Sequence, residues 1–160
     1  MRGTARSVED YLLEVADLVE RLGITIRGDP DIPLLEDRNG GLSFEFVGDL
    51  PDGQDPAQSE IIIREAFERD GRDSYVRARY EHELIDRERG FRRAFHLHHS
   101  DWFERRFLVV VHEHCERPIG AVDCEHYEGT PVRDAFAGVL ALVDAWTGDP
   151  LDCSTLRCLA

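Results

Sequence analysis

The strongest constraint on the fold is a series of short segments that have the pattern of β-strands, flanked by two segments with helical periodicity. The clearest strand, residues 74–84 (SYVRARYEHEL), alternates between apolar and polar residues, and Asp70-Gly71 before it is typical of a hairpin turn. Strands joined by short turns pair antiparallel. The sequence therefore predicts a mostly antiparallel sheet of about six strands. The expected strands are 42–47 (LSFEFV), 60–67 (EIIIREAF), 74–84, 91–99 (FRRAFHLHH), 107–115 (FLVVVHEHC) and 121–127 (AVDCEHY).

Both ends of the chain have helical patterns. Residues 7–23 form one apolar stripe, and Ser7 is a suitable N-cap. Residues 129–150 contain the second stripe, with Thr130 as the expected cap and Pro131 at the first helical position. We therefore predict an α+β fold in one domain spanning residues 1–160, with the N-terminal and C-terminal helices packed on one face of the sheet. The predicted stripes are Val8, Tyr11, Leu12, Val15, Leu18, Val19 and Leu22 in the first helix, and Val132, Phe136, Val139, Leu140 and Val143 in the second.

The chain is strongly acidic, with a formal net charge of −14, and all 19 basic residues are arginine. An acidic surface normally repels nucleic acid, which is one interpretation of this charge. The other is adaptation to a saline cytosol, where a Debye length of about 3 Å at molar salt screens the charge. We favour the second, because the bias extends over the whole chain. The N-terminal stretch has no apolar signal region, and no apolar run approaches the length of a membrane span, so a cytoplasmic protein with no membrane partner is expected.

The four cysteines are Cys115, Cys124, Cys153 and Cys158. They are few and widely spaced for a chain of this length, and no Cys-x-x-Cys occurs. Disulfides are also rare in cytosolic proteins. The sequence therefore predicts four reduced thiols.

The stretch from His96 to Cys115 holds five of the seven histidines. On a strand, alternate residues share a face, so His96 and His98 are expected to lie with Arg92, whereas Arg93 faces the other way. His112 and His114 share a face of the next strand by the same rule. Histidine and arginine are thus concentrated on neighbouring elements.

Cleavage of RNA by its own 2′-hydroxyl requires a base, an acid and a cation at the phosphate. Histidine titrates near neutrality and can serve as base or acid. The planar guanidinium of arginine matches phosphate oxygens. The concentration of histidine and arginine therefore leads to the hypothesis of a metal-independent ribonuclease. In this hypothesis the proton-transfer residues are His98, His99, His112 and His114, and the phosphate-binding residues are Arg92, Arg93 and Arg106.

A metal site is the alternative. Zinc prefers three or four His, Cys or carboxylate ligands in tetrahedral geometry. The candidate set is His112, His114, Cys124 and His126, from two strands that the sequence predicts to be neighbours. One residue of register decides whether the two pairs meet or face apart, so both outcomes remain open. Two solvated histidines on a half-exposed strand are the simpler interpretation.

The order of these segments resembles the TumE family of toxins from toxin–antitoxin pairs. The corresponding stretches are DLPDG followed by SEIIIRE, then RYEHELID, FRRAFHLHH and VHEHC, across roughly residues 42–126. The resemblance implies a toxin that acts as a ribonuclease without a required metal or other cofactor. It also implies RNA and a helix-turn-helix antitoxin protein as partners. A zinc-binding protein without enzymatic activity, or a partner-binding domain with no chemistry, are the alternative functions.

Overall fold

The computed structural model describes residues 2–28, 31–51, 58–121, 124–148 and 153–159. Its strands are β1 (Arg2–Gly3), β2 (Thr25–Ile26), β3 (Leu35–Glu36), β4 (Leu42–Asp49), β5 (Ser59–Arg69), β6 (Tyr75–Asp86), β7 (Phe91–Leu97), β8 (Val111–Glu116) and β9 (Tyr127–Glu128). Its helices are α1 (Ala5–Arg21), α2 (Asp101–Phe107) and α3 (Ala135–Thr147), with a 3₁₀ turn η1 (Cys153–Thr155).

The strands form one antiparallel sheet in the order β2-β4-β5-β6-β7-β8-β9, with β1 paired to β6 and β3 paired to β4. This confirms the predicted α+β class with a mostly antiparallel sheet. The sheet has nine strands within the described residues rather than about six, because β1, β2, β3 and β9 are only two residues long. Pieces this short carry too little periodicity to be found in a sequence.

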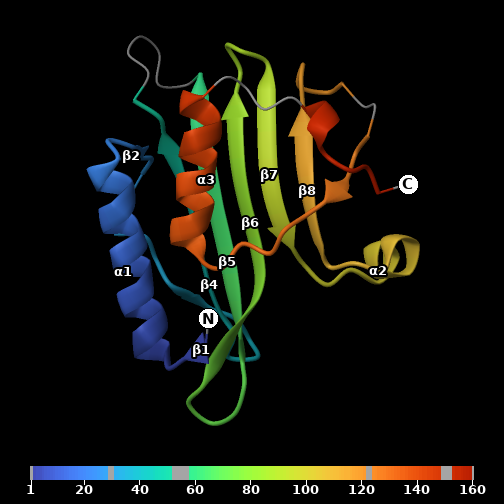
Figure 1. Ribbon diagram of the computed structural model, residues 1–160. Helices are drawn as coiled ribbons and strands as arrows, with labels where there is room; N and C mark the ends of the chain where they lie inside the picture. The colour runs from blue at the N-terminus through green and yellow to red at the C-terminus, as the bar shows by residue number, and fades with distance from the viewer. Residues whose placement is uncertain (1, 29–30, 52–57, 122–123, 149–152, 160) are drawn as a thin grey trace.

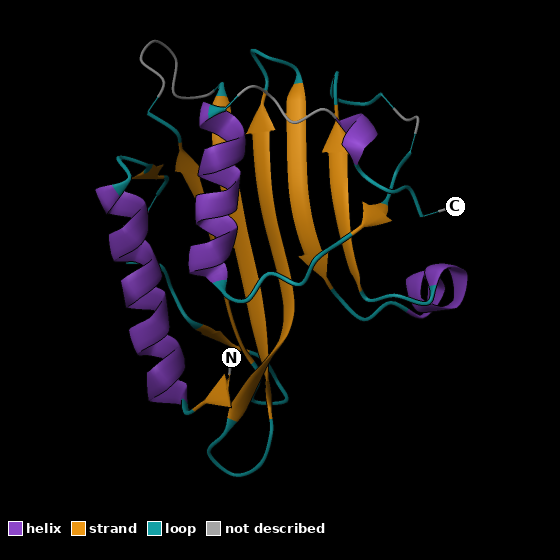
Figure 2. Cartoon of the chain, viewed as in Figure 1, coloured by secondary structure: helices purple, strands orange, loops and turns teal. Residues whose placement is uncertain are grey.

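Helices α1 and α3 lie side by side on one face of the sheet, as predicted (Figures 1 and 2). They cover the core formed with the inward side chains of β4, β5 and β6. The stripe predicted for the first helix is confirmed, with five of its members buried: Val8, Tyr11, Leu12, Val15 and Val19. Thr4 caps this helix, and its side chain accepts a hydrogen bond from the Ser7 amide, so the helix begins earlier than residue 7.

The second helix differs from its prediction at its start and in its stripe. It begins at Ala135 because the Asp134 side chain accepts a hydrogen bond from the Ala137 amide and caps the helix there. Thr130 and Pro131 lie instead in the loop that precedes α3. The residues that α3 buries are small for the most part: Ala135, Gly138, Val139, Leu142 and Ala145.

This choice of small residues follows from a close approach between α3 and β6. A Cβ atom placed on Gly138 would lie 2.0 Å from Nδ1 of His82. His82 is fully buried and projects from β6 toward the helix. Because Gly138 has no side chain, α3 packs directly against the imidazole ring of His82.

A β-bulge interrupts the alternation expected along residues 74–84. Ala66 pairs with Arg79, but the next residue of β5, Phe67, pairs with Arg77, so Ala78 is passed over. A bulge reverses which side chains face the core beyond it. Consequently Arg77 turns to the helix-covered face, whereas Val76 is 36% exposed.

Helix α2 follows β7 and packs at the lower end of β7 and β8 in the view of Figure 1. Ser100 occupies the N-cap position of α2 in an extended conformation, without a capping hydrogen bond from its side chain. Leu108 ends the helix in the left-handed conformation at φ 59°. The strand predicted from 107 is therefore wrong at its start, and β8 begins at Val111.

The prediction of reduced thiols is wrong. Disulfides join Cys115 to Cys153 and Cys124 to Cys158. The partners lie 38 and 34 residues apart in the sequence, and the bonds form because the C-terminal tail folds back against β8 and β9.

In the part of the chain that the structure describes, no helix is both long and apolar enough to cross a membrane.

Candidate functional site

The seven histidines lie in three environments. His82 is buried under α3 and contacts the Glu65 carboxylate at 3.0 Å. His99 is exposed and pairs with Glu104 at 2.9 Å. The remaining five gather on the sheet face opposite α1 and α3, in a group we call the histidine cluster: His96, His98, His112, His114 and His126.

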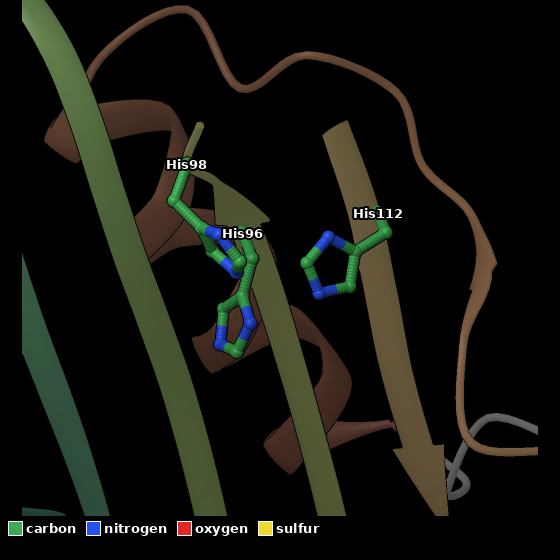
Figure 3. Close-up of side chains that lie close together, drawn as sticks. All are labelled: His96, His98 and His112. Carbon is green, nitrogen blue, oxygen red and sulfur yellow. The ribbon is translucent and has the colours of Figure 1, made fainter. Parts of the chain in front are cut away.

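Strand register explains how the cluster forms. His96 of β7 lies directly opposite His112 of β8, and His114 lies two residues farther along the same face of β8. His98 follows the end of β7, and His126 immediately precedes β9. Figure 3 shows the rings of His96, His98 and His112 turned toward the same space between the two strands. The predicted common face of Arg92, His96 and His98 agrees with this arrangement.

The rings of the cluster are closely spaced. Ring centroids of neighbouring pairs lie between 4.7 and 6.0 Å apart. Nε2 of His112 lies 3.1 Å from Nε2 of His114. Two groups of three imidazoles have nitrogen atoms within 4.8 Å of one another, and His112 belongs to both. We call them the upper triad, His96–His98–His112, and the edge triad, His112–His114–His126.

Helix α2 covers part of the cluster with aromatic side chains. The buried Phe103 stacks on His112 with ring centroids 4.1 Å apart, and it meets His126 edge-on at 5.0 Å. Phe107 also contacts His126 edge-on, at 5.5 Å. These contacts exclude water from one side of the cluster and hold the rings in place.

Burial keeps the cluster in its neutral form. It lowers the pKa of His112 from 6.5 to about 3, with further lowering from neighbouring histidines such as His114. Burial likewise lowers the pKa of His114 to about 4 and that of His96 to about 2. The pKa values of His98 and His126 are lowered for the same principal reason. Neutral imidazole is the form that coordinates metal ions.

Two ring nitrogens of the edge triad have no hydrogen-bond partner although they are buried. They are Nδ1 of His112 and Nδ1 of His126. A buried polar atom without a partner costs roughly 1–3 kcal/mol, so native proteins rarely leave one unsatisfied without a ligand, ion or water. Nδ1 of His82 and two nitrogens of Arg93 on the helix-covered face are unpartnered as well, so these atoms do not by themselves distinguish the cluster from the rest of the fold.

The arginines predicted to bind phosphate do not converge on the cluster. Arg92 lies beside it but forms ion pairs with Glu83 and Glu116. Arg93 is buried on the opposite, helix-covered face and pairs with Glu113, because adjacent residues of a strand face opposite ways. Arg106 is exposed on α2, with its guanidinium over the ring of Phe107.

The predicted zinc set is assembled in part. His112, His114 and His126 meet, as the metal hypothesis required. The role of Cys124 as a fourth ligand is wrong for this state, because its sulfur is bonded to Cys158 and cannot be a thiolate. Of the described residues in the strand predicted at 121–127, only Tyr127 belongs to a strand, β9, and His126 immediately precedes it; residues 122 and 123 lie outside the described residues.

Of the four histidines predicted to transfer protons, three belong to the cluster and His99 does not. His98 and His99 together line an open groove of ≈ 470 Å³, with Arg79 on its wall. The predicted set of proton-transfer residues did not include His96, whose pairing with His112 depends on the β7–β8 register.

Comparison of the chain with protein-family models, curated proteins and solved structures finds no match.

Proposed function

We propose that the histidine cluster binds a divalent transition metal ion of the zinc class. The observation that carries this proposal is the convergence of imidazole nitrogens in two overlapping triads that share His112. The nitrogens of each triad lie within 4.8 Å of one another. Zn–N bonds of about 2.0–2.1 Å allow two nitrogens on one ion to be at most about 4.2 Å apart, so any pair wider than that would have to close in for the triad to surround one ion.

The donor set favours a particular class of metal. Both triads consist of imidazoles alone, with no carboxylate among them. Imidazole suits zinc, copper, nickel and iron, whereas magnesium and calcium require oxygen ligands. A group of neutral, partly buried rings therefore selects a borderline transition metal over a hard cation.

A three-histidine site leaves one position of a tetrahedral ion open for water or another ligand. A pocket of ≈ 280 Å³ adjoins the edge triad and is lined in part by His114, His126 and Arg92. Phe103 and Phe107 close the other side. The arrangement resembles catalytic zinc sites in having three protein ligands and an accessible fourth position.

Calorimetric titration of the purified protein with zinc tests the proposal. The wild type should bind zinc, and His112→Gln should weaken binding most, because both triads lose a ligand. The loss should exceed the roughly 10–100-fold that changes in the second coordination shell cause. His99→Gln is the matched control: it makes the same chemical change at an exposed ring outside the cluster and should bind as the wild type does.

Circular dichroism of the apo proteins shows whether His112→Gln folds. If it does not, His126→Gln replaces it, because His126 is less buried and belongs only to the edge triad. A wild type that takes up no zinc, copper or nickel would refute the proposal. Equal binding by the wild type and a folded His112→Gln would refute the assignment of the ligands, whereas equal binding by His126→Gln would exclude the edge triad and leave the upper triad as the site.

We propose metal-independent RNA cleavage as the second candidate, as the TumE resemblance implies. The groove lined by His98, His99 and Arg79 supports it, since two histidines and an arginine border one open space of ≈ 470 Å³. Arg79 also forms an ion pair with Glu81, which a phosphate would have to displace. Glu104 contacts Nδ1 of His99 at 2.9 Å and could orient that ring. In this reading RNA and a helix-turn-helix antitoxin are the partners.

RNA cleavage in the presence of a chelator tests this candidate. His99→Gln should lower the rate by about 10²–10⁴-fold if that ring transfers a proton, while zinc binding by the variant stays intact. The two single variants form a matched pair: His99→Gln should lose RNA cleavage and keep zinc binding, and His126→Gln tests the metal site. Failure of the wild type to cleave single-stranded RNA at both low and molar salt would eliminate the nuclease and leave the metal site unaffected.

A further inference from the structure

We propose that the Cys124–Cys158 disulfide regulates the ligand set of the metal site: its reduction frees Cys124 as a thiolate ligand beside His114 and His126. This inference rests on the proposed metal-binding function. In the oxidised protein the edge triad supplies imidazoles only. In the reduced protein the same site would present three imidazoles and one sulfur.

The position of Cys124 supports this assignment. Cys124, His114 and His126 line the same pocket, the one of ≈ 280 Å³ that adjoins the edge triad. The Cys124 sulfur lies 2.8 Å from the main-chain oxygen of His126, two residues along the chain. Cys124 therefore borders the pocket beside the triad, and its sulfur, which is not among the ligand atoms that converge in the oxidised protein, would have to turn toward the rings once it is released.

The segment should keep its place after the disulfide is broken, because backbone hydrogen bonds also hold it. The Leu159 amide donates to the His126 carbonyl at 2.9 Å, and the Glu128 amide donates to the Arg157 carbonyl at 2.8 Å. On its other side β9 pairs with β8. Reduction thus releases the sulfur of Cys124 without removing the contacts that place His126 at the cluster.

The second disulfide is far less accessible to a reductant. Cys115 is only 2% exposed and lies in the core on the helix-covered face, where it is bonded to Cys153. Cys158, in contrast, is exposed, and Cys124 is half-buried. Because thiol–disulfide exchange requires access to a sulfur, a reductant should react first with the Cys124–Cys158 bond.

The chemistry balances with a dithiol as the reductant. One thiolate of the dithiol attacks the exposed Cys158 sulfur, the Cys124–Cys158 bond breaks, and Cys124 leaves as a thiolate. The second thiol then attacks the mixed disulfide, which releases Cys158 as a thiol and oxidises the dithiol to its own disulfide. Two electrons pass to the protein, Cys158 retains one proton, and the other goes to solvent when Cys124 stays deprotonated at the metal.

Cobalt(II) is the probe for the experiment, because a cobalt–thiolate bond gives a near-ultraviolet charge-transfer band that imidazole ligands do not give. The full-length oxidised protein should bind cobalt without this band. After treatment with a dithiol and removal of the excess reagent, the band should appear with an intensity of one thiolate per cobalt.

Two single variants form a matched pair. Cys158→Ser leaves Cys124 unpaired without any reductant, so it should show the band in its untreated form. Cys124→Ser cannot supply the ligand, so it should show no band in either state. Thiol titration of the unfolded variants checks that each retains the Cys115–Cys153 bond and one free thiol.

The outcomes separate this inference from the proposed function. If no state of the protein binds cobalt, the metal site itself is refuted. If cobalt binds to reduced wild type and to Cys158→Ser without a thiolate band, the metal site stands and the role of Cys124 is refuted. A band in reduced Cys124→Ser equal to that of reduced wild type would also refute it, because another cysteine would then be the ligand.

Discussion

Each face of the sheet carries a group of buried or half-buried polar side chains, and the two groups are built differently. On the helix-covered face Glu65 accepts hydrogen bonds from Tyr11 at 3.0 Å and from Arg77 at 2.8 Å, and it contacts Nε2 of His82 at 3.0 Å. On the opposite face, imidazole rings contact mainly one another and aromatic rings.

The difference is the reason for treating the Glu65 group as structural and the histidine cluster as the proposed binding site. Around Glu65 one carboxylate meets several donors, so its lone pairs are matched within the fold. His82 has no room for an ion at Nδ1, where α3 packs against the ring at Gly138. In the histidine cluster the Nε2 atoms of His112 and His114 face each other at 3.1 Å, and at most one hydrogen can lie between them. In the apo protein one ring donates its N–H to the other nitrogen, and a metal ion bound by both nitrogens would take the place of that hydrogen.

The largest expected effect comes from Glu65→Ala. The substitution leaves Arg77 without its buried carboxylate, where the two side chains are 7% and 0% exposed. Removing one partner of a buried ion pair costs about 3–5 kcal/mol. Denaturant unfolding measures the loss. Glu45→Ala is the control, because Glu45 pairs with Arg64 on the exposed face, and it should cost less than about 1 kcal/mol. Equal losses would contradict the structural role of Glu65.

Zinc should stabilise the wild type by about 2.7 kcal/mol at a concentration 100 times the dissociation constant. His114→Gln should lose most of this gain, whereas Glu45→Ala should keep all of it. The measurement is the free energy of unfolding with and without zinc. If zinc stabilises His114→Gln as much as the wild type, the edge triad does not hold the ion.

Acidification should destabilise the apo protein through the cluster. Burial lowers the pKa of His112 to about 3 and that of His114 to about 4, from 6.5. Between those values and 6.5 the unfolded chain binds protons that the folded protein does not. Stability is therefore complete above about pH 6.5 and falls as the pH falls toward 4, by about 2 kcal/mol for each of the two rings between pH 7 and pH 5.

The double variant His112→Gln/His114→Gln should show a flatter dependence on pH over the same range. The comparison requires unfolding curves at pH 7, 6 and 5 in the presence of a chelator. An unchanged slope in the double variant would show that acid acts elsewhere in the molecule, for example on its carboxylates.

The smallest effect is expected from salt. The formal net charge of −14 creates repulsion that salt screens, so stability should rise between low and molar salt. The dependence should be the same in the wild type and in His112→Gln, because the cluster is neutral near pH 7. Stability that does not change with salt would remove the interpretation of the acidic composition as a salt adaptation.

The sequence predicted the elements whose patterns are local. The stripe of α1, the strands β4 to β7 and the common face of Arg92 and His96 all follow from periodicity. The pairing of His96 with His112 does not follow from periodicity, because a short turn between the predicted strands 91–99 and 107–115 would have placed His96 opposite Val110. The register depends instead on α2, which lies between β7 and β8.

The rest depends on contacts between distant parts of the chain. The bulge at Ala78 turns Arg77 toward Glu65, and nothing in the alternation of residues 74–84 indicates it. The disulfides join residues more than 30 positions apart, so spacing gives no signal for them. His126 reaches the cluster only because the C-terminal tail pairs with its segment.

X-ray absorption at the zinc edge, recorded on the oxidised protein loaded with one equivalent of zinc, tests the central claim most directly. The account predicts a first shell of nitrogen or oxygen at about 2.0–2.1 Å, with the outer-shell scattering of at least three imidazole rings and no sulfur. His99→Gln should give the same spectrum, and His112→Gln should lose imidazole scattering. A spectrum of hydrated zinc, or of carboxylate ligands alone, would contradict the claim that the histidine cluster is a metal site.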